Sequence, residues 1–171
     1  THHASSAASD VYKRQQQEAS RKLGFGVTRT MSTAQKLYEA GLITYMRTDS
    51  VTISNEAKSS IVQKIESKYG EDYVNLRDYK NKNKSAQEAH EAVRPTDINI
   101  EEITSDYDQQ RLYHLIWKRT ISSQMSDAQI ERTVVNIKSD SYNEFFIARG
   151  EGIKFDGFLR VYNEGTDDEV Q

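Results

Sequence analysis

Tyr45 and Arg47 are the two residues of this 171-residue chain whose types and spacing best support chemistry. A tyrosine phenolate can attack a phosphodiester and form a covalent intermediate. A guanidinium two residues away can bind the phosphate and stabilise the charge that builds up in the transition state. The alternative is a half-buried surface tyrosine, because the chain contains 10 tyrosines and a Tyr-x-Arg spacing also arises by chance.

The sequence around Tyr45 is more specific than that spacing. Residues 37–50, LYEAGLITYMRTDS, resemble the active-site segment of type IA DNA topoisomerases, most closely the bacterial ones. Further stretches resemble the same family in the same order: QEASRKLGFG at 17–26, QEAHEAVRPTD at 87–97, LYHLIW at 112–117 and FDGF at 155–158. Several motifs in order are rarely accidental, and the resemblance runs from about residue 15 to about residue 162.

The resemblance implies a function for the longer protein of which this chain would be a fragment. Tyr45 would be the nucleophile and Arg47 would contact the scissile phosphate. In the family, the tyrosine attacks single-stranded DNA and becomes linked to a 5′ phosphate, a second strand passes through the gap, and the 3′ hydroxyl reverses the attack. Negatively supercoiled DNA is thereby relaxed without ATP.

Three more residues are predicted to belong to the DNA site. His90 matches the histidine of the family's EAHEA motif near the DNA phosphates, and a charged histidine could bind a phosphate. Arg94 lies four residues further on and would share a face with His90 in a helical turn. Asp49 is expected to orient Arg47 through a charged hydrogen bond. The alternative for His90 is a structural role in the core or at a cap.

A formal net charge of −3 hides a cluster of cations before the tyrosine. Phosphate binding depends on local Lys and Arg rather than on the sum of charges. The candidate DNA-binding residues in this cluster are Arg21, Lys22, Arg29 and Lys36. Charge runs are more often solvated faces, so this prediction rests on the resemblance as well.

No metal site is predicted in this chain. The family binds Mg²⁺ through an Asp-x-Asp motif in a separate domain, and the full-length enzyme is expected to hold its Mg²⁺ there. Asp106 and Asp108 have that spacing, but they are expected to open a helix, where acidic residues suit the helix dipole. With no cysteine, a thiolate zinc site and disulfides are excluded.

Apolar periodicity predicts the helices that position these residues. A first helix ends at Gly24. A second begins near Thr28 or Thr30, ends at Gly41 and turns Met31, Ala34, Leu37 and Tyr38 inward. A third is capped by Ser54, buries Ala57, Ile61, Ile65 and Tyr69, and stops at Gly70. Residues 75–87 are predicted to form a loop. A long helix is expected to be capped by Ser105, with Tyr113, Ile116, Trp117 and Ile121 inward and His114 structural.

The pattern then changes to strands, predicted at 133–137, 144–148 and 158–162. The expected fold is mainly α with a smaller β part: a helical active-site domain followed by antiparallel strands of an incomplete arch domain. The predicted divisions are a tail unlike the family at 1–14, the helical domain at 15–131, the strand-rich part at 132–163 and an acidic tail at 164–171.

DNA, preferentially single-stranded, is the expected partner of a monomer. No run of 18 apolar residues suggests a membrane span, and a cytoplasmic, nucleoid-associated bacterial protein is expected. One rival is a tyrosine recombinase, which needs several dispersed Arg and His residues around a C-terminal tyrosine. Another is an isolated helical module that binds single-stranded DNA without catalysis of its own.

Overall fold

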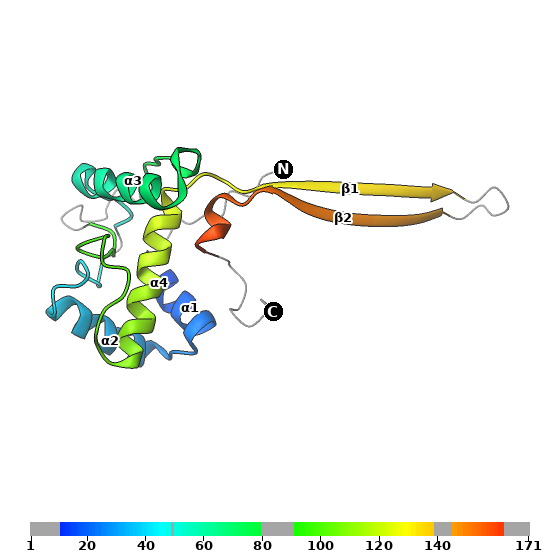
Figure 1. Ribbon diagram of the computed structural model, residues 1–171. Helices are drawn as coiled ribbons and strands as arrows, with labels where there is room; N and C mark the ends of the chain where they lie inside the picture. The colour runs from blue at the N-terminus through cyan, green and yellow to red at the C-terminus, as the bar shows by residue number, and fades with distance from the viewer. Residues whose placement is uncertain (1–10, 49, 80–90, 139–144, 163–171) are drawn as a thin grey trace.

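The computed structural model describes residues 11–48, 50–79, 91–138 and 145–162 (Figure 1). Within these ranges, four α-helices form a body and a two-stranded antiparallel ribbon projects from it. The predicted fold class, mainly α with a smaller β part, is confirmed. None of the described helices is long and apolar enough to cross a membrane.

Helix α4, Tyr107–Ser123, is the centre of the helical body (Figure 1). Its predicted inward residues Tyr113, Ile116, Trp117 and Ile121 are all buried. The indole of Trp117 donates a 2.8 Å hydrogen bond to the carbonyl of Ile98, so the loop before the helix is fixed to its buried face. The N-cap is Asp106 rather than the predicted Ser105, because the Asp106 carboxylate accepts from the backbone N–H of Gln109 at 2.9 Å.

Helices α1, Val11–Leu23, and α2, Val27–Glu39, pack beside α4. Helix α1 begins inside the segment predicted as a tail and ends, as predicted, just before Gly24. In α2, Ala34 and Leu37 are buried as expected and Met31 is partly buried. The prediction for Tyr38 is wrong: its side chain is 41% exposed and lies at the edge of the core near Tyr45.

Helix α3, Asn55–Tyr69, confirms its predicted limits. Ser54 caps it by accepting a hydrogen bond from the backbone N–H of Ala57, and Gly70 ends it. The short helix η1, Glu71–Tyr73, follows. Residues 75–79, the described part of the predicted loop, are tied to the end of α4: the backbone N–H groups of Asn75 and Arg77 donate to Gln124 at 2.9 and 3.0 Å.

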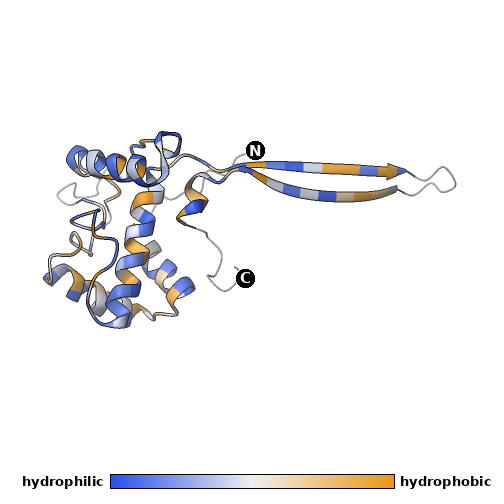
Figure 2. Ribbon diagram, viewed as in Figure 1, coloured by the Kyte–Doolittle hydropathy of each residue, from blue (hydrophilic) through white to orange (hydrophobic). Residues whose placement is uncertain are grey.

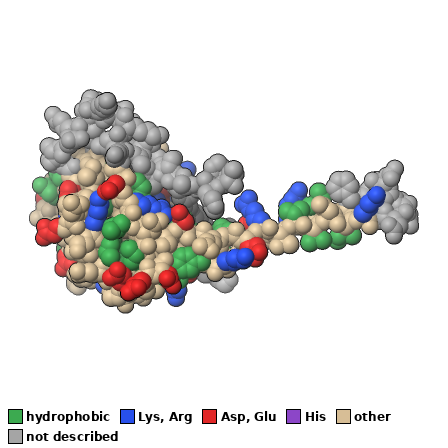
Figure 3. Space-filling view, turned by 90° about the horizontal axis from the view of Figure 1, so that it is seen from above, with side chains coloured by type: hydrophobic (Ala, Val, Ile, Leu, Met, Phe, Trp, Pro, Cys, Tyr) green, Lys and Arg blue, Asp and Glu red, His purple; other side chains and the backbone are tan. Residues whose placement is uncertain are grey.

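Strands β1, Gln129–Lys138, and β2, Phe145–Phe155, pair antiparallel along their whole length. Strand β1 includes the strand predicted at 133–137, and β2 includes residues 145–148 of the strand predicted at 144–148. Residue 144 lies outside the described residues. Both strands are rich in apolar residues (Figure 2), and apolar side chains lie on the surface of the ribbon (Figure 3). Those exposed by 40% or more are Ile130, Val134, Val135, Ile137, Phe146, Ile147 and Ile153.

The prediction of a third strand, at 158–162, is wrong. The 3₁₀ helix η2, Gly157–Arg160, occupies most of it. Gly157 has a φ of +50°, which reverses the chain after β2, and turn hydrogen bonds link Val161 and Tyr162 back to Phe158. Tyr162 is then buried between α1 and α4, where its hydroxyl contacts Glu18 and its ring faces Lys22 and Arg119. Packing against the helices outweighs the strand propensity of these residues.

Two glycines with positive φ allow a test of what closes the base of the ribbon. Gly41→Ala is expected to cost about 1–2 kcal/mol, because a left-handed conformation is strained for any residue with a Cβ. Its added Cβ meets nothing within 4 Å, whereas a Cβ at Gly157 would lie 2.4 Å from the Ser126 carbonyl oxygen. Gly157→Ala should therefore lower the free energy of unfolding clearly more than Gly41→Ala in urea titrations followed by Trp117 fluorescence. Equal losses would contradict the close approach of the two backbones.

Candidate active site

The segment that carries Tyr45 starts at a well-defined helix end. Gly41 has a φ of +71°, its N–H donates to the carbonyl of Tyr38 at 2.8 Å, and the N–H of Leu42 donates to that of Leu37 at 2.9 Å. This pair of bonds is a Schellman motif, which needs a residue in the left-handed conformation and therefore favours glycine. Helix α2 thus ends at a fixed residue, and the chain leaves it in a fixed direction.

The next residues pair with a second segment far away in the sequence. Ile43 and Pro95 form an antiparallel bridge. The N–H of Thr44 donates to the carbonyl of Arg94 at 2.9 Å, and that of Thr96 donates to the carbonyl of Leu42 at 3.0 Å. The extended run predicted before Tyr45 is therefore present, held as a short strand-like pair.

Tyr45 itself is half-buried between two buried neighbours. Ile43 and Met46 are each 1% exposed and anchor the segment in the core. The ring of Tyr45 meets that of Tyr38 edge to face, with centroids 5.4 Å apart and planes at 71°. Tyr45 is therefore partly accessible to solvent while its ring is supported from α2.

Other described tyrosines are less suited to attack. Burial together with the charge of Asp97 raises the pKa of Tyr113 to about 12. Burial also raises the pKa of Tyr162, and its hydrogen bond to Glu18 acts in the same direction. Both phenols are 2% exposed or less, so DNA could not reach them without unfolding.

Arg47 lies on the surface two residues after Tyr45. The turn that follows it is held from within: the hydroxyl of buried Thr48 accepts from the N–H of Ser50 at 3.0 Å, and that of Ser50 accepts from Thr52 at 3.2 Å. Arg47 is thus an exposed cation on a backbone fixed at both sides. Asp49, its predicted orienting partner, lies outside the described residues.

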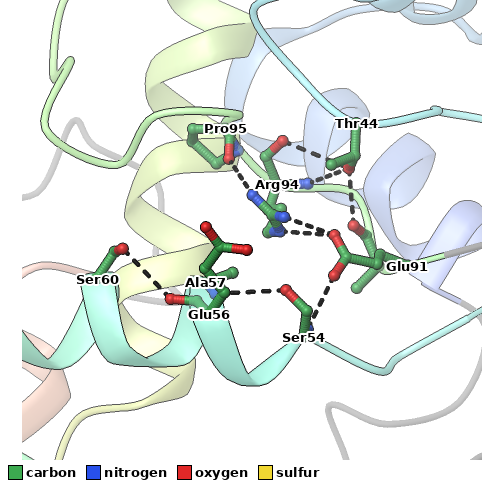
Figure 4. A network of polar contacts seen from close by, with 9 residues as sticks. Thr44, Ser54, Glu56, Ala57, Ser60, Glu91, Arg94 and Pro95 are labelled. Carbon is green, nitrogen blue, oxygen red and sulfur yellow. Dashed lines mark hydrogen bonds and ion pairs between the residues drawn. The ribbon is translucent and has the colours of Figure 1, made fainter.

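Arg94, predicted to bind DNA, is instead engaged within the protein (Figure 4). Its Nε and Nη2 donate to the same carboxylate oxygen of Glu91 at 3.0 and 2.6 Å, and its Nη1 donates to the carbonyl of Pro95 at 3.0 Å. Residues 91–94 are not helical, so the helical turn expected to align Arg94 with His90 does not include them. His90 lies outside the described residues.

Glu91 is held by two segments at once. Its other carboxylate oxygen accepts from the N–H of Ser54 at 2.9 Å. Burial acts to raise the pKa of Glu91, but the hydrogen bond from Ser54 and the charge of Arg94 outweigh it, so the pKa lies below the usual value for glutamate. Glu91 is therefore an anion at neutral pH, suited to hold Arg94 in place.

The cations predicted on α2 face acids at the start of α4. Arg29 makes two 2.7 Å hydrogen bonds to Asp108, and this contact raises the pKa of its guanidinium. Lys36 lies 3.9 Å from Asp106. Asp106 and Asp108 thus serve as a helix cap and an ion-pair partner, as expected for a helix start rather than a metal site. The described part of the chain contains no group of three or more His, Cys, Asp or Glu that could hold a metal ion.

The predicted cations on α1 lie elsewhere. Arg21 is exposed in the last turn of that helix, and Lys22 lies 4.2 Å from the ring centroid of Tyr162. Lys22 also lines a hollow of about 760 Å³ whose walls come from α1, α4 and residues 101–104 and 161–162. Neither Tyr45 nor Arg47 lines this hollow. His114 does, and it stacks on Trp117 with the planes at 10°, which fits a structural role.

Sequence reasoning assigned no role to Thr44 and Glu91, the residues that hold the Tyr45 segment to its neighbours. Both lie within stretches that resemble the family, at 37–50 and 87–97. Thr44 directly precedes the nucleophile candidate, and Glu91 lies three residues before Arg94, a spacing that permits an ion pair. The signal was present, but the direction in which these side chains point depends on tertiary contacts.

Most of this chain resembles proteins of one known family. The family model described as DNA topoisomerase matches residues 12–171. DNA topoisomerase 1 of Rickettsia conorii is 48% identical over 172 residues, covering 91% of this chain and 22% of that protein. DNA topoisomerase 1 of Streptomyces coelicolor is 51% identical over 161 residues, covering 90% of this chain and 17% of that protein.

A solved structure gives the same result in three dimensions. Full-length topoisomerase I from Thermotoga maritima superposes with a TM-score of 0.74 at 33% identity, covering 96% of this chain and 29% of that one. The chain thus spans 17–29% of the length of these three relatives. From its motifs, its fold and these relatives, the chain belongs to the type IA DNA topoisomerases and corresponds to the part that carries the Tyr45 segment.

Proposed function

We propose that the longer protein containing this chain relaxes negatively supercoiled DNA by transient single-strand cleavage, strand passage and religation. The observation that carries the proposal is the presentation of Tyr45, half-buried on a segment that is fixed on both sides and two residues from the exposed cation Arg47. Membership of the topoisomerase family supports it.

The cleavage step is a transesterification at phosphorus. The phenol oxygen of Tyr45 loses its proton and forms a bond to phosphorus, while the bond between phosphorus and the 3′ oxygen of the preceding nucleotide breaks. The 3′ oxygen takes up a proton and leaves as a hydroxyl, and the 5′ phosphate stays on the tyrosine. Arg47 stabilises the charge on the phosphate oxygens, and the reverse step reseals the strand.

Magnesium would act from another domain of the longer protein. The described residues do not fit a magnesium site, because Asp106 caps α4 and Asp108 binds Arg29. The part of the mechanism assigned to this chain is therefore to hold the nucleophile and to neutralise the phosphate. The full-length enzyme would bind Mg²⁺ through carboxylates outside this chain.

Single-stranded DNA is the proposed partner of a monomeric, cytoplasmic and nucleoid-associated enzyme. Arg21 and Arg47 are exposed cations on the described surface, and His90 and Asp49 remain proposed members of the DNA site. Arg29 and Lys36 share their charge with Asp108 and Asp106, so each should contribute less to phosphate binding than a cation without an acidic neighbour.

The alternative concerns the chain by itself, as a helical module that binds single-stranded DNA without catalysis. The observation in its favour is that Asp106 caps α4 and Asp108 pairs with Arg29 of α2. The isolated 171-residue chain is therefore expected not to relax a negatively supercoiled plasmid in the presence of magnesium, because metal-ion help accounts for much of phosphoryl-transfer catalysis. Relaxation by the pure chain would overturn this division of roles.

Tyr45→Phe tests the nucleophile in a complete enzyme. Such an enzyme can be made by replacing the matching part of the Rickettsia conorii protein with residues 12–171. The variant should form no covalent adduct with a labelled single-stranded oligonucleotide trapped by denaturant, yet bind it nearly as well, because the ring that packs on Tyr38 is kept. Tyr38→Phe is the matched control and should still form the adduct. An adduct on the Tyr45→Phe enzyme would show that another tyrosine attacks.

Substitution of Arg47 should slow formation of the covalent tyrosine–DNA adduct but should not abolish it. Arg47→Ala is expected to slow single-turnover cleavage by roughly 10²-fold or more, the cost of losing one transition-state charge contact. Arg47→Lys should recover part of this loss, because an ammonium cannot reproduce the forked geometry of guanidinium on phosphate. Unchanged cleavage by Arg47→Ala would remove Arg47 from the phosphate site.

A further inference from the structure

A network of partly buried polar side chains is centred on Thr44, the residue directly before Tyr45. Figure 4 shows Thr44 and Arg94 lying close together, with Glu91 and Ser54 extending the network to the start of α3. Residues 91–94 are distant in sequence from both of their partners, because Thr44 and Arg94 are 50 positions apart and Ser54 and Glu91 are 37 apart.

The hydroxyl of Thr44 acts as both acceptor and donor. It accepts from the backbone N–H of Arg94 at 2.9 Å and donates to the carbonyl of Ala92 at 2.8 Å. The backbone N–H of Thr44 donates to the carbonyl of Arg94 at 2.9 Å. The side chain therefore extends the short backbone pairing and fixes which residues of the two segments face each other.

Arg94 and Glu91 connect this pairing to a helix end. Arg94 donates to Glu91 and to the carbonyl of Pro95, and Glu91 accepts from the N–H of Ser54, the N-cap of α3. The side chains of Arg94 and Glu91 are 16% and 31% exposed. An ion pair this far out of water is screened less by salt than a surface pair. Removal of one partner leaves the charge of the other unpaired.

We propose that Thr44, Arg94 and Glu91 are positioning residues for Tyr45, setting the rate of its attack on DNA rather than the affinity for DNA. The inference rests on the proposed function, in which Tyr45 is the nucleophile. Attack requires the phenol oxygen to lie in line with the phosphorus–oxygen bond, and a displacement of about 1 Å can cost about 10²-fold in rate. A residue that fixes the backbone next to the nucleophile acts directly on that geometry.

This role differs from the phosphate contact predicted for Arg94 from sequence. Three nitrogens of its guanidinium already donate to Glu91 and Pro95. A phosphate would have to compete with a carboxylate at 2.6 Å. The two roles predict different effects on salt dependence, because each lost phosphate contact reduces the slope of log K against log salt by about 1.

The first test compares Thr44→Val with Thr44→Ser in the enzyme that contains residues 12–171. Valine keeps the shape and loses the hydroxyl, whereas serine keeps the hydroxyl. Thr44→Val should slow single-turnover cleavage of a labelled oligonucleotide by about 10- to 100-fold with little change in Kd, and Thr44→Ser should keep most of the wild-type rate. Wild-type cleavage by Thr44→Val, or an equal loss for both variants, would overturn the proposal.

The second test addresses the ion pair. Glu91→Gln and Arg94→Lys should each lower the cleavage rate while leaving the salt dependence of binding unchanged. Glu56→Gln is the matched control: Glu56 is exposed one residue into α3, the contact that it makes in Figure 4 is through its backbone carbonyl, and its loss should leave the rate unchanged. A salt slope lowered by about 1 in Arg94→Gln, which removes the charge, would instead assign Arg94 to the phosphate.

Failure of the positioning role can be told apart from failure of the proposed function. An adduct on Tyr45→Phe would reject Tyr45 as the nucleophile, whatever Thr44 does. Loss of that adduct together with wild-type cleavage by Thr44→Val would keep the function and reject the positioning role. Circular dichroism melting of each variant shows whether it folds, and Arg94→Lys, which keeps the charge and most of the packing, decides the question if Thr44→Val does not fold.

Discussion

The pairing of the Tyr45 segment with the chain around Arg94 is the contact on which the candidate site depends. It joins two stretches separated by 50 positions, from Thr44 to Arg94, so the contact must offset the entropy cost of closing that loop. Two inter-segment backbone bonds would make a weak strand pair, but the Thr44 hydroxyl adds two more and the Glu91–Arg94 pair attaches the result to α3. Buried Ile43 and Met46 then place the ring of Tyr45 at the edge of the core.

The helical body provides the rigid frame for this contact. Helix α4 buries seven residues, and the loop before it is tied down through Trp117 and Tyr113, which donate to the carbonyls of Ile98 and Ile100. The loop lies directly after Pro95, so anchoring it also restrains the segment that pairs with Thr44. Tyr38 completes the frame from α2 by placing its ring edge to face with that of Tyr45.

The features that sequence predicted well are those with a local physical cause. A left-handed stop at Gly41, a cap at Ser54 and the buried stripe of α4 each depend on residues within one or two helical turns. The features it missed depend on distant partners. Sequence alone suggests that Arg29 is an unpaired cation, but it binds Asp108, which is 79 positions away. Sequence also suggests a strand at 158–162, but Tyr162 is buried against the helices instead. The shift of the α4 cap from Ser105 to Asp106 is a smaller error of the same kind, because both residues can cap a helix and the loop before it decides between them.

The site shows the same division. Tyr45 and Arg47 were predicted from the resemblance of residues 37–50 to the family, and the structure places the first half-buried and the second on the surface. Arg94 was predicted to bind DNA, but its guanidinium makes hydrogen bonds to Glu91 and Pro95 within the protein. Whether a guanidinium faces a carboxylate or the solvent is settled by packing, which no spacing encodes.

The ribbon leaves and re-enters the body at a single place. Phe158, just after β2, donates to the carbonyl of Ser126, just before β1, at 2.9 Å, and Tyr73 contacts both Phe155 and Asp156 there. With 10 residues in β1 at about 3.3 Å each, the ribbon is about 33 Å long. Because these contacts hold the ribbon at its base, a rotation of a given angle there would displace each residue of β1 and β2 in proportion to its distance from η1 and η2.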